Sequence, residues 1–250
     1  MADTTPLRGK TAVVTGASGG MGRAIAERLA KDGAHLVVHC GTRLERAQQV
    51  VESIQAGGGV ATLIQADLSR VSEAQRLIAQ ADEWAQSQGL GLDILVNNAG
   101  RFVPKSVDET TEADFDAIFA VNTKAPFFTM QAAARVIRDG GSIVNISSVL
   151  TQMTFAGATV HLGSKAALEQ FTRGLALEVA SRGITVNTVL PGITDTGVLT
   201  DEVRAKGVAL SPFKRVGEPR DIADVVAFLV SDEARWLTGQ RIQAAGGMVM

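Results

Sequence analysis

A glycine-rich turn between an apolar run and a helical pattern limits most strongly how this chain can fold. Residues 10–15 (KTAVVT) form an apolar segment, residues 16–22 read GASGGMG, and the helical pattern of residues 23–30 (RAIAERLA) follows. This order is typical of a phosphate-binding βα unit, because glycine allows a tight turn and lets backbone N–H groups approach a pyrophosphate. A glycine turn that binds no ligand is the alternative interpretation. Either way, the pattern predicts an α/β protein.

The rest of the chain repeats the alternation of apolar runs and helical patterns. Further strands are expected at residues 35–40, 60–65, 93–96, 142–146, 183–190 and 238–242, with helices at 43–55, 71–88, 113–139, 158–181 and from 218 onward. We therefore predict a single-domain Rossmann fold over residues 1–250: a doubly wound, seven-stranded parallel sheet with helices on both faces.

The composition excludes several classes of function. Of 250 residues, 46% are hydrophobic and 20% charged, and the net charge is −2 with the basic residues scattered, so neither nucleic acid nor an anionic membrane is an expected partner. The single Cys40 excludes an internal disulfide and a CxxC metal site, and no metal is expected. We see no membrane-spanning run, and residues 1–10 lack the apolar core of a signal peptide, so a soluble cytoplasmic protein is expected.

A second segment carries side chains suited to catalysis. Ser147 and Ser148 follow the strand expected at residues 142–146, at the strand end where open α/β sheets bind ligands. His161 and Lys165 are four residues apart in the next expected helix and therefore share one face. A hydroxyl, an imidazole and an ammonium are expected to converge there.

This segment resembles the active-site segment of the short-chain dehydrogenase/reductase family. The family carries Ser, then Tyr thirteen residues later, then Lys four residues after that, so Ser148 and Lys165 match and His161 occupies the tyrosine position. The chain contains no tyrosine, so no neighbouring phenol can replace it. The resemblance covers residues 8–247. The sequence departs from the family pattern at the proton-donor position, which is His161.

The resemblance implies a dinucleotide site along one edge of the sheet. TGxxxGxG at residues 15–22, NNAG at 97–100 and PGxxxT at 191–196 match the family. The implied cofactor-binding residues are Gly16, Ser18, Gly20, Met21, Gly22, Thr42, Arg43, Asp67, Leu68, Asn98, Ala99, Gly100, Lys165, Pro191, Gly192, Thr194 and Thr196.

The end of the second expected strand favours NADP(H) over NAD(H). Many NAD-binding relatives hold the adenosine ribose with an acidic residue where this chain has Cys40. Without that carboxylate a 2′-phosphate meets no repulsion, and Arg43 could pair with it while Thr42 hydrogen-bonds it. Alternatively, Arg43 is a solvated residue that opens the next helix. Asp67, which the resemblance assigns to the adenine amino group, could instead cap a helix.

The resemblance implies four catalytic residues: Asn122, Ser148, His161 and Lys165. In the family, tyrosine exchanges a proton with the substrate oxygen, lysine binds the nicotinamide ribose, serine steadies the substrate oxygen and asparagine completes a water relay. Imidazole is a competent acid near neutral pH, but it is shorter than a phenol, and the cationic Lys165 disfavours its protonation. Asn122 could alternatively stabilise a kink before Pro126.

We expect an NADPH-dependent reductase of a ketone in a hydrophobic small molecule. Phe102, Met153 and Phe155 favour such a substrate, and the apolar residues of an expected substrate-covering loop at about 195–217 either line its pocket or pack internally. Other functions stay open: reduction of a conjugated C=C bond, which needs less from the proton donor; a non-redox reaction such as cyclisation or dehydration; and a binding or regulatory role.

The resemblance also implies a homotetramer built on the helices expected at 113–139 and 158–181 and on the C-terminal strand. Alanine-rich faces such as residues 132–134 permit close helix approach. Relatives commonly read VDGG where residues 244–247 read AAGG, so Ala245 is expected to affect a subunit contact more than the chemistry.

Overall fold

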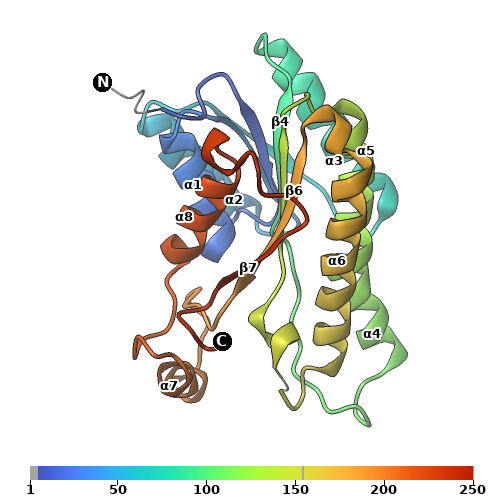
Figure 1. Ribbon diagram of the computed structural model, residues 1–250, viewed down its shortest axis with the longest axis vertical. Coiled ribbons are helices and arrows are strands. Elements are labelled where there is room, and N and C mark those ends of the chain that lie inside the picture. The colour runs from blue at the N-terminus through green and yellow to red at the C-terminus, as the bar shows by residue number, and fades with distance from the viewer. Residues whose placement is uncertain (1–4, 154, 250) are drawn as a thin grey trace.

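The computed structural model describes residues 5–153 and 155–249, and within them all strands belong to one parallel sheet (Figure 1). The strands are β1 (Thr11–Val14), β2 (His35–Cys40), β3 (Ala61–Gln65), β4 (Leu92–Asn97), β5 (Ser142–Ile146), β6 (Thr185–Pro191) and β7 (Arg241–Ala244). Their order in the sheet is β3-β2-β1-β4-β5-β6-β7. The order reverses between β1 and β4, the switch point at which such sheets bind ligands. The predicted Rossmann fold is confirmed.

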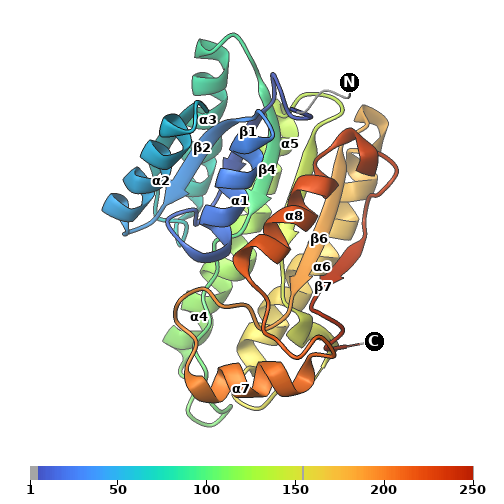
Figure 2. The same cartoon turned by 90° about the vertical axis from the view of Figure 1, so that its left-hand side faces the viewer.

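Helices cover both faces of the sheet, as predicted (Figures 1 and 2). One face carries α1 (Gly20–Lys31), α2 (Leu44–Ala56) and α8 (Pro219–Leu229), and the other carries α3 (Val71–Ser87), α5 (Ala125–Val136) and α6 (Thr159–Glu178). Each layer buries an apolar stripe, which Ile25 and Leu29 represent on α1 and Leu77 and Ile78 on α3. Among the described helices, none is both long and apolar enough to cross a bilayer.

The helical region expected at 113–139 consists of three segments. α4 (Glu112–Phe119) leads into a π-helical turn (Ala120–Lys124), and α5 follows with Pro126 near its start. A proline removes one backbone donor, and the wider turn lies directly before it. The segment directly before Pro126 is therefore a π-helix, and Asn122 lies within it.

The expected substrate-covering loop contains a helix that the sequence pattern did not predict, α7 (Asp201–Leu210). Thr200 caps this helix by accepting a hydrogen bond from the N–H of Val203, at 3.3 Å, and two carboxylates occupy its first turn. Figure 2 shows α7 apart from both helix layers, at one end of the sheet.

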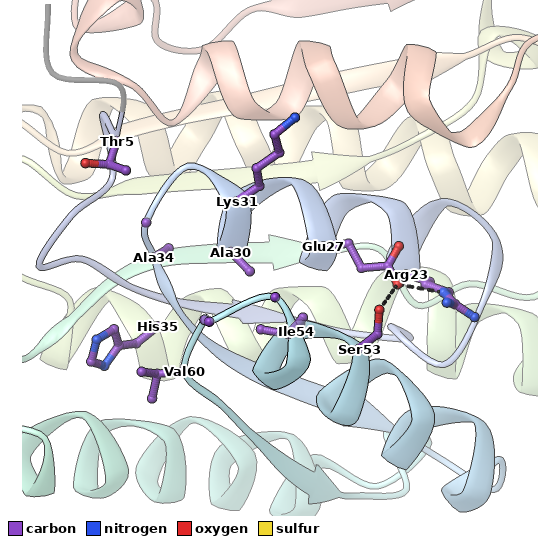
Figure 3. A pocket seen from close by; sticks show the side chains of 14 residues that line it. Thr5, Arg23, Glu27, Ala30, Lys31, Ala34, His35, Ser53, Ile54 and Val60 are labelled. Carbon is purple, nitrogen blue, oxygen red and sulfur yellow. Dashed lines mark hydrogen bonds and ion pairs between the residues drawn. The ribbon is translucent and has the colours of Figure 1, made fainter.

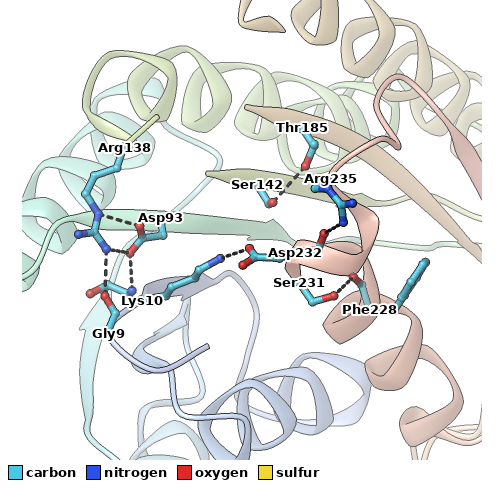
Figure 4. A network of polar contacts seen from close by, with 11 residues as sticks. Gly9, Lys10, Asp93, Arg138, Ser142, Thr185, Phe228, Ser231, Asp232 and Arg235 are labelled. Carbon is cyan, nitrogen blue, oxygen red and sulfur yellow. Dashed lines mark hydrogen bonds and ion pairs between the residues drawn. The ribbon is translucent and has the colours of Figure 1, made fainter. Parts of the chain in front are cut away.

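An ion pair fixes the opposite end of the sheet, where β1 and β4 begin (Figure 4). The guanidinium of Arg138 donates to both carboxylate oxygens of Asp93, each at 2.7 Å, and the N–H of Thr11 donates to the same carboxylate at 2.8 Å. Such a bidentate pair is the strong form of an ion pair. It ties two central strands and the end of α5 together, away from the ends that carry the site.

Two predicted strand starts are displaced by left-handed glycines. The strand expected from residue 183 begins at Thr185, because Gly183 has a φ of +67°. The strand expected from residue 238 begins at Arg241, because Gly239 has a φ of +69° and donates its N–H to Val186 O at 2.8 Å. These left-handed positions favour glycine, and they end the preceding connections.

Candidate active site

The glycine turn after β1 forms a cradle that a side chain would fill. A Cβ on Gly22 would lie 2.3 Å from Gly16 O, and one on Gly16, whose φ is +66°, would lie 2.9 Å from Ala99 Cα. α1 begins at Gly20, and no side chain among the described residues caps its first turn. A Cβ on Gly19 would meet nothing within 4 Å. Open N–H groups at a helix start fit a pyrophosphate, so the turn fits a dinucleotide.

The end of β4 is tied to this turn by Thr15. Its Oγ1 accepts hydrogen bonds from the N–H groups of Asn98 (2.9 Å) and Ala99 (3.0 Å), and the Asn98 amide donates back to Thr15 O at 2.9 Å. The NNAG segment and the glycine turn are thus one hydrogen-bonded unit. The sequence prediction named Asn98 and Ala99 but missed Thr15, although it opens the TGxxxGxG motif.

A buried histidine on β2 supports the same turn. The N–H of Gly16 donates to His39 Nδ1 at 3.1 Å, and the N–H of Ala17 donates to His39 O at 2.8 Å. Because Nδ1 accepts, Nε2 carries the hydrogen and donates to Ala66 O at 3.0 Å. Burial lowers the pKa of His39 to about 4, so the imidazole is neutral. The sequence prediction missed His39, whose signal is a polar ring within an otherwise buried strand.

The adenosine end of the expected site lies where β2 and β3 end. Thr42 and Arg43 are both exposed there, and Arg43 precedes the first residue of α2. Asp67 accepts from the N–H of Ser69 at 3.0 Å, so it closes a turn, whereas Arg70 occupies the position before α3. The helix-cap alternative for Asp67 is therefore wrong. Leu68 is buried beside it.

Lys165 is the most buried cation of the site, with only 4% of the residue exposed. Its Nζ donates to Ile146 O at 2.7 Å, at the end of β5. A Cβ on Gly100 would lie 3.4 Å from both Lys165 Nζ and Asn122 Oδ1, so the NNAG glycine lies beside both polar groups. Burial lowers the pKa of Lys165 to about 8, and the nearby Glu169 carboxylate partly opposes that effect.

Asn122 links three segments from within the π-helix. Its amide nitrogen donates to Arg101 O at 2.9 Å and to Ser164 Oγ at 3.1 Å, and its oxygen accepts from the N–H of Arg101 at 2.7 Å. All these partners lie outside its own helical segment, so its contacts hold the strand-end loop against α6. They give no support to the alternative in which Asn122 only stabilises a kink.

His161 lies on α6 beside the same loop and is half-buried. Its Nδ1 is 3.3 Å from Arg101 O and 3.4 Å from Asn122 Nδ2, and its ring packs against Phe102 at 4.9 Å between centroids. Both hydrogens of the Asn122 amide already point to nearer acceptors, so Nδ1 carries its own hydrogen toward Arg101 O and Nε2 is bare. Burial, followed by the charge of Lys165, lowers the pKa of His161 to about 4.

Ser148 ends the extended segment after β5 and opens a short 3₁₀ helix, η2 (Val149–Gln152). Its Oγ accepts from the N–H of Leu150 at 3.2 Å, and its carbonyl accepts from the N–H of Thr151 at 3.1 Å. Ser148 is only partly buried. The hydroxyl therefore has a fixed position at the same strand end that receives Lys165.

The remaining predicted cofactor residues lie around the glycine turn and after β6. Ser18 and Met21 are partly buried within the turn and the first turn of α1, and Pro191 ends β6. A Cβ on Gly20 would lie 3.0 Å from the Cβ of Thr196. The glycine turn and the PGxxxT segment therefore meet. Gly192 and Thr194 belong to the same segment, and Thr194 Oγ1 donates to Gly192 O at 3.0 Å.

A lysine–ring contact links α7 to the loop before α6. Lys206 Nζ lies 4.0 Å from the centroid of the Phe155 ring, a cation–π geometry. In contrast, Val198 and Phe213 of the substrate-covering segment are largely exposed. For these two residues, the internal-packing alternative is wrong.

Known proteins match over nearly the whole chain. A family described as "Enoyl-(Acyl carrier protein) reductase" matches residues 16–249. An uncharacterized oxidoreductase of Methylorubrum extorquens is 46% identical over 248 residues, which cover 97% of this chain and 98% of that protein. The chain belongs to the short-chain dehydrogenase/reductase family. It is an oxidoreductase of that type.

Two reductases illustrate the similarity within this family. The angucycline C-6 ketoreductase LanV, solved with bound NADP, superimposes with a TM-score of 0.94 at 46% identity, covering 97% of this chain and 96% of LanV. A hydroxynaphthalene reductase-like protein of Metarhizium brunneum is 40% identical over 261 residues, covering 97% of this chain and 96% of that protein.

A second hollow in this short-chain dehydrogenase/reductase lies away from the residues described above. The hollow in Figure 3, of about 660 Å³, lies between α1, α2 and the starts of β2 and β3. Three of its polar side chains pair with one another: Arg23 Nε and Ser53 Oγ both donate to Glu27, at 2.9 and 3.2 Å. Over the residues that the structure describes, no group of three or more His, Cys, Asp or Glu could hold a metal.

Proposed function

We propose that this protein reduces a ketone on a fused-ring aromatic substrate, with NADPH as the reductant. The observation that carries the proposal is the buried cluster of Lys165, Asn122 and the Gly100 backbone at the carboxyl end of β5. A desolvated ammonium beside a buried amide, at the switch-point edge of the sheet, suits the binding of a cofactor ribose.

The NADP preference rests on the chain's own residues and on a relative. Position 40 is a buried cysteine with no carboxylate to repel a 2′-phosphate, and the exposed guanidinium of Arg43 and hydroxyl of Thr42 follow it. LanV, at 46% identity, was solved with NADP. When bound, the cofactor supplies the hydride. We propose that the glycine turn, Asp67, Leu68, the NNAG segment, Lys165 and the 191–196 segment hold it.

The substrate class rests on two relatives and on the aromatic surroundings of His161. The relatives' names describe a ketoreductase acting at C-6 of an angucycline and a reductase of hydroxynaphthalene, which is a fused pair of aromatic rings. In this chain the half-exposed Phe102 packs edge-on against His161, and Phe155 lies under Lys206. Aromatic side chains of this kind favour flat apolar ligands.

Each remaining residue has a defined part in the proposed reaction. Ser148 donates a hydrogen bond from its hydroxyl to the ketone oxygen and stabilises the charge that develops there. His161 occupies the family's tyrosine position and transfers the proton, while Asn122 holds the Arg101 carbonyl that orients the imidazole.

Proton transfer is the weak step of this arrangement. With its hydrogen on Nδ1, a neutral His161 presents a bare Nε2, which accepts and does not donate. Donation therefore needs the imidazolium, and a pKa of about 4 leaves about one molecule in a thousand protonated at pH 7. We propose a slow ketone reductase at neutral pH whose rate rises on acidification.

The test is cofactor oxidation with NADPH over three matched compounds: 2-tetralone, cyclohexanone and 2-cyclohexenone. The proposal expects 2-tetralone to be reduced to its alcohol faster than cyclohexanone, and faster at pH 6 than at pH 8. NADPH binding without reduction of any ketone at either pH would contradict it.

Reduction of a conjugated C=C bond is the second candidate. The matching family's description as an enoyl reductase favours it, as does a site whose imidazole is neutral. A saturated ketone as the product from 2-cyclohexenone, with 2-tetralone unchanged, would select this function over the first.

We also propose a homotetramer that uses the outer face of α5 and α6. Phe127 and Phe171 are 39% and 37% exposed, with ring centroids 5.1 Å apart. They line a shallow hollow of about 720 Å³ together with Phe119 and Phe128. An exposed aromatic patch of this kind marks an interface more often than a free surface.

A further inference from the structure

A buried carboxylate on α6 has no part in the reaction described so far. Glu169 follows Lys165 by one helical turn, and only 2% of the residue is exposed. A buried carboxylate is costly unless each oxygen has a partner. Here Oε1 accepts from Ser147 Oγ at 2.6 Å and from Thr151 Oγ1 at 2.7 Å, and Oε2 lies 3.2 Å from Arg241 Nη1.

The two hydroxyl donors lie on either side of Ser148. Ser147 precedes it, and Thr151 lies in η2, whose first turn Ser148 caps. Thr151 also contacts Ser148 directly, because its N–H donates to the Ser148 carbonyl at 3.1 Å and its Oγ1 lies 2.9 Å from the same oxygen. One carboxylate oxygen thus closes the turn from both ends and fixes the backbone from which the Ser148 hydroxyl projects.

The same carboxylate supplies negative charge to the Lys165 side of the site. In the described chain, the charged or titratable groups around this cluster are His161 and Glu169 of α6 and Arg241 of β7. Glu169 favours the charged form of Lys165, whereas burial and any cation disfavour it. Arg241 is about half exposed, so solvent and salt screen its charge more than they screen the charge of the buried Lys165.

We propose that Glu169 is a positioning residue with two separable effects: its hydrogen bonds hold the Ser148 turn, and its charge keeps Lys165 cationic for cofactor binding. The inference rests on the proposed function for Ser148 but not for Lys165, because cofactor binding is measured without any ketone. The two effects therefore need two sets of variants.

Glu169→Gln tests the charge, since glutamine keeps an oxygen for Ser147 and Thr151 but is neutral. NADPH affinity, measured by cofactor fluorescence from pH 6 to 10, should decrease as the pH rises and Lys165 loses its proton. In Glu169→Gln the midpoint of this decrease should lie roughly one pH unit lower than in the wild type. Arg241→Gln should raise the midpoint, because it removes a cation that disfavours the charged form of Lys165. Glu178→Gln is the matched control, an exposed carboxylate on the same helix, and should leave the midpoint unchanged.

Ser147→Ala combined with Thr151→Val tests the turn, since both hydroxyl donors are lost and the carboxylate remains. The turnover number on 2-tetralone should fall by roughly tenfold or more, with the NADPH midpoint kept within a few tenths of a pH unit.

Unfolding midpoints of all variants establish that each is folded. Glu169→Gln with an unchanged midpoint, or the double variant with unchanged turnover, would overturn the corresponding half of the inference. If the wild type reduced no ketone yet Glu169→Gln moved the midpoint, the proposed function would fail while the charge effect stood.

Discussion

Gly16 donates its backbone N–H to the buried imidazole of His39, and this bond joins the glycine turn to the second strand. The other ring nitrogen of His39 donates to Ala66 O, at the end of β3. One neutral side chain therefore sets the distance between the pyrophosphate end and the adenosine end of the proposed cofactor site. Protonation would place a hydrogen on Nδ1, facing the Gly16 N–H, and break that link.

Stability should therefore decrease on mild acidification. The pKa of His39 is about 4 in the folded chain and about 6.5 in the unfolded chain, so between these values the unfolded chain binds more protons. The contribution is complete above pH 6.5 and is lost as the pH falls toward 4. Urea unfolding should show about 2 kcal/mol lost at pH 5 relative to pH 7.5 from this group alone.

His39→Gln is the variant that isolates this effect. Glutamine does not titrate, so the difference in unfolding free energy between pH 7.5 and 5 should shrink by about 2 kcal/mol. His161, whose pKa is also lowered to about 4, should contribute a similar dependence, which His161→Gln removes. An equal pH dependence in the wild type and in His39→Gln would show that this imidazole is not held neutral.

Cofactor discrimination should depend on Arg43. The exposed guanidinium beside Thr42 lies where no carboxylate opposes a 2′-phosphate. Calorimetry should give tighter binding of NADPH than of NADH, and Arg43→Ala should weaken NADPH binding by roughly tenfold with little change for NADH. Arg46→Ala, an exposed arginine one turn further into α2, is the matched control. Equal affinities of the wild type for both cofactors would argue against the preference.

The role of His161 should be visible in a pH series with two substitutions. If its imidazolium donates the proton, ketone turnover should fall by about tenfold per pH unit above its pKa of about 4, and His161→Phe should remove that slope. His161→Tyr should raise turnover at pH 7 by roughly 10²-fold or more, because the rest of the site is in place. A fast reductase that tolerates His161→Phe would refute the proton-donor assignment and favour C=C reduction.

Assembly should depend on the aromatic patch of α5 and α6. Light scattering at micromolar concentration should give a tetramer, and Phe171→Asp should reduce it to a smaller species, since a carboxylate would be buried in the contact. Leu177→Asp, at an exposed position further along α6, is the control. A wild-type monomer would remove the proposal, and a wild-type dimer would point to the altered contact at Ala245.

Short motifs explain why so much of the fold was predictable. TGxxxGxG and NNAG depend on backbone geometry, and the Cβ clashes at Gly16 and Gly22 show that other side chains cannot fit there. The spacing of His161 and Lys165 likewise predicted their shared helix face. Features of this kind depend on residues close in sequence, and a single chain displays them.

The supporting contacts were not predictable, because they join residues distant in sequence. His39 reaches Gly16 across 23 positions, and Glu169 reaches Ser147 across 22. The sequence around His39 or Glu169 contains no pattern that identifies the residue it contacts. The start of α7 does carry a local signal, since Thr200 followed by two carboxylates is a helix-start pattern, but the loop implied by the family resemblance did not include a helix.

The π-helical turn at Ala120–Lys124 makes Asn122 vulnerable to a change that no point substitution would reveal. Such a turn contains one residue more than an α-helix needs over the same rise. Deleting a single residue beside Asn122 would let the segment relax into a regular helix with little loss of hydrogen bonding. The flanking helices would keep their relative orientation, but the wider turn that directs the Asn122 amide toward Arg101 and Ser164 would be lost. The position of the Asn122 amide thus depends on chain length within this segment as well as on residue identity.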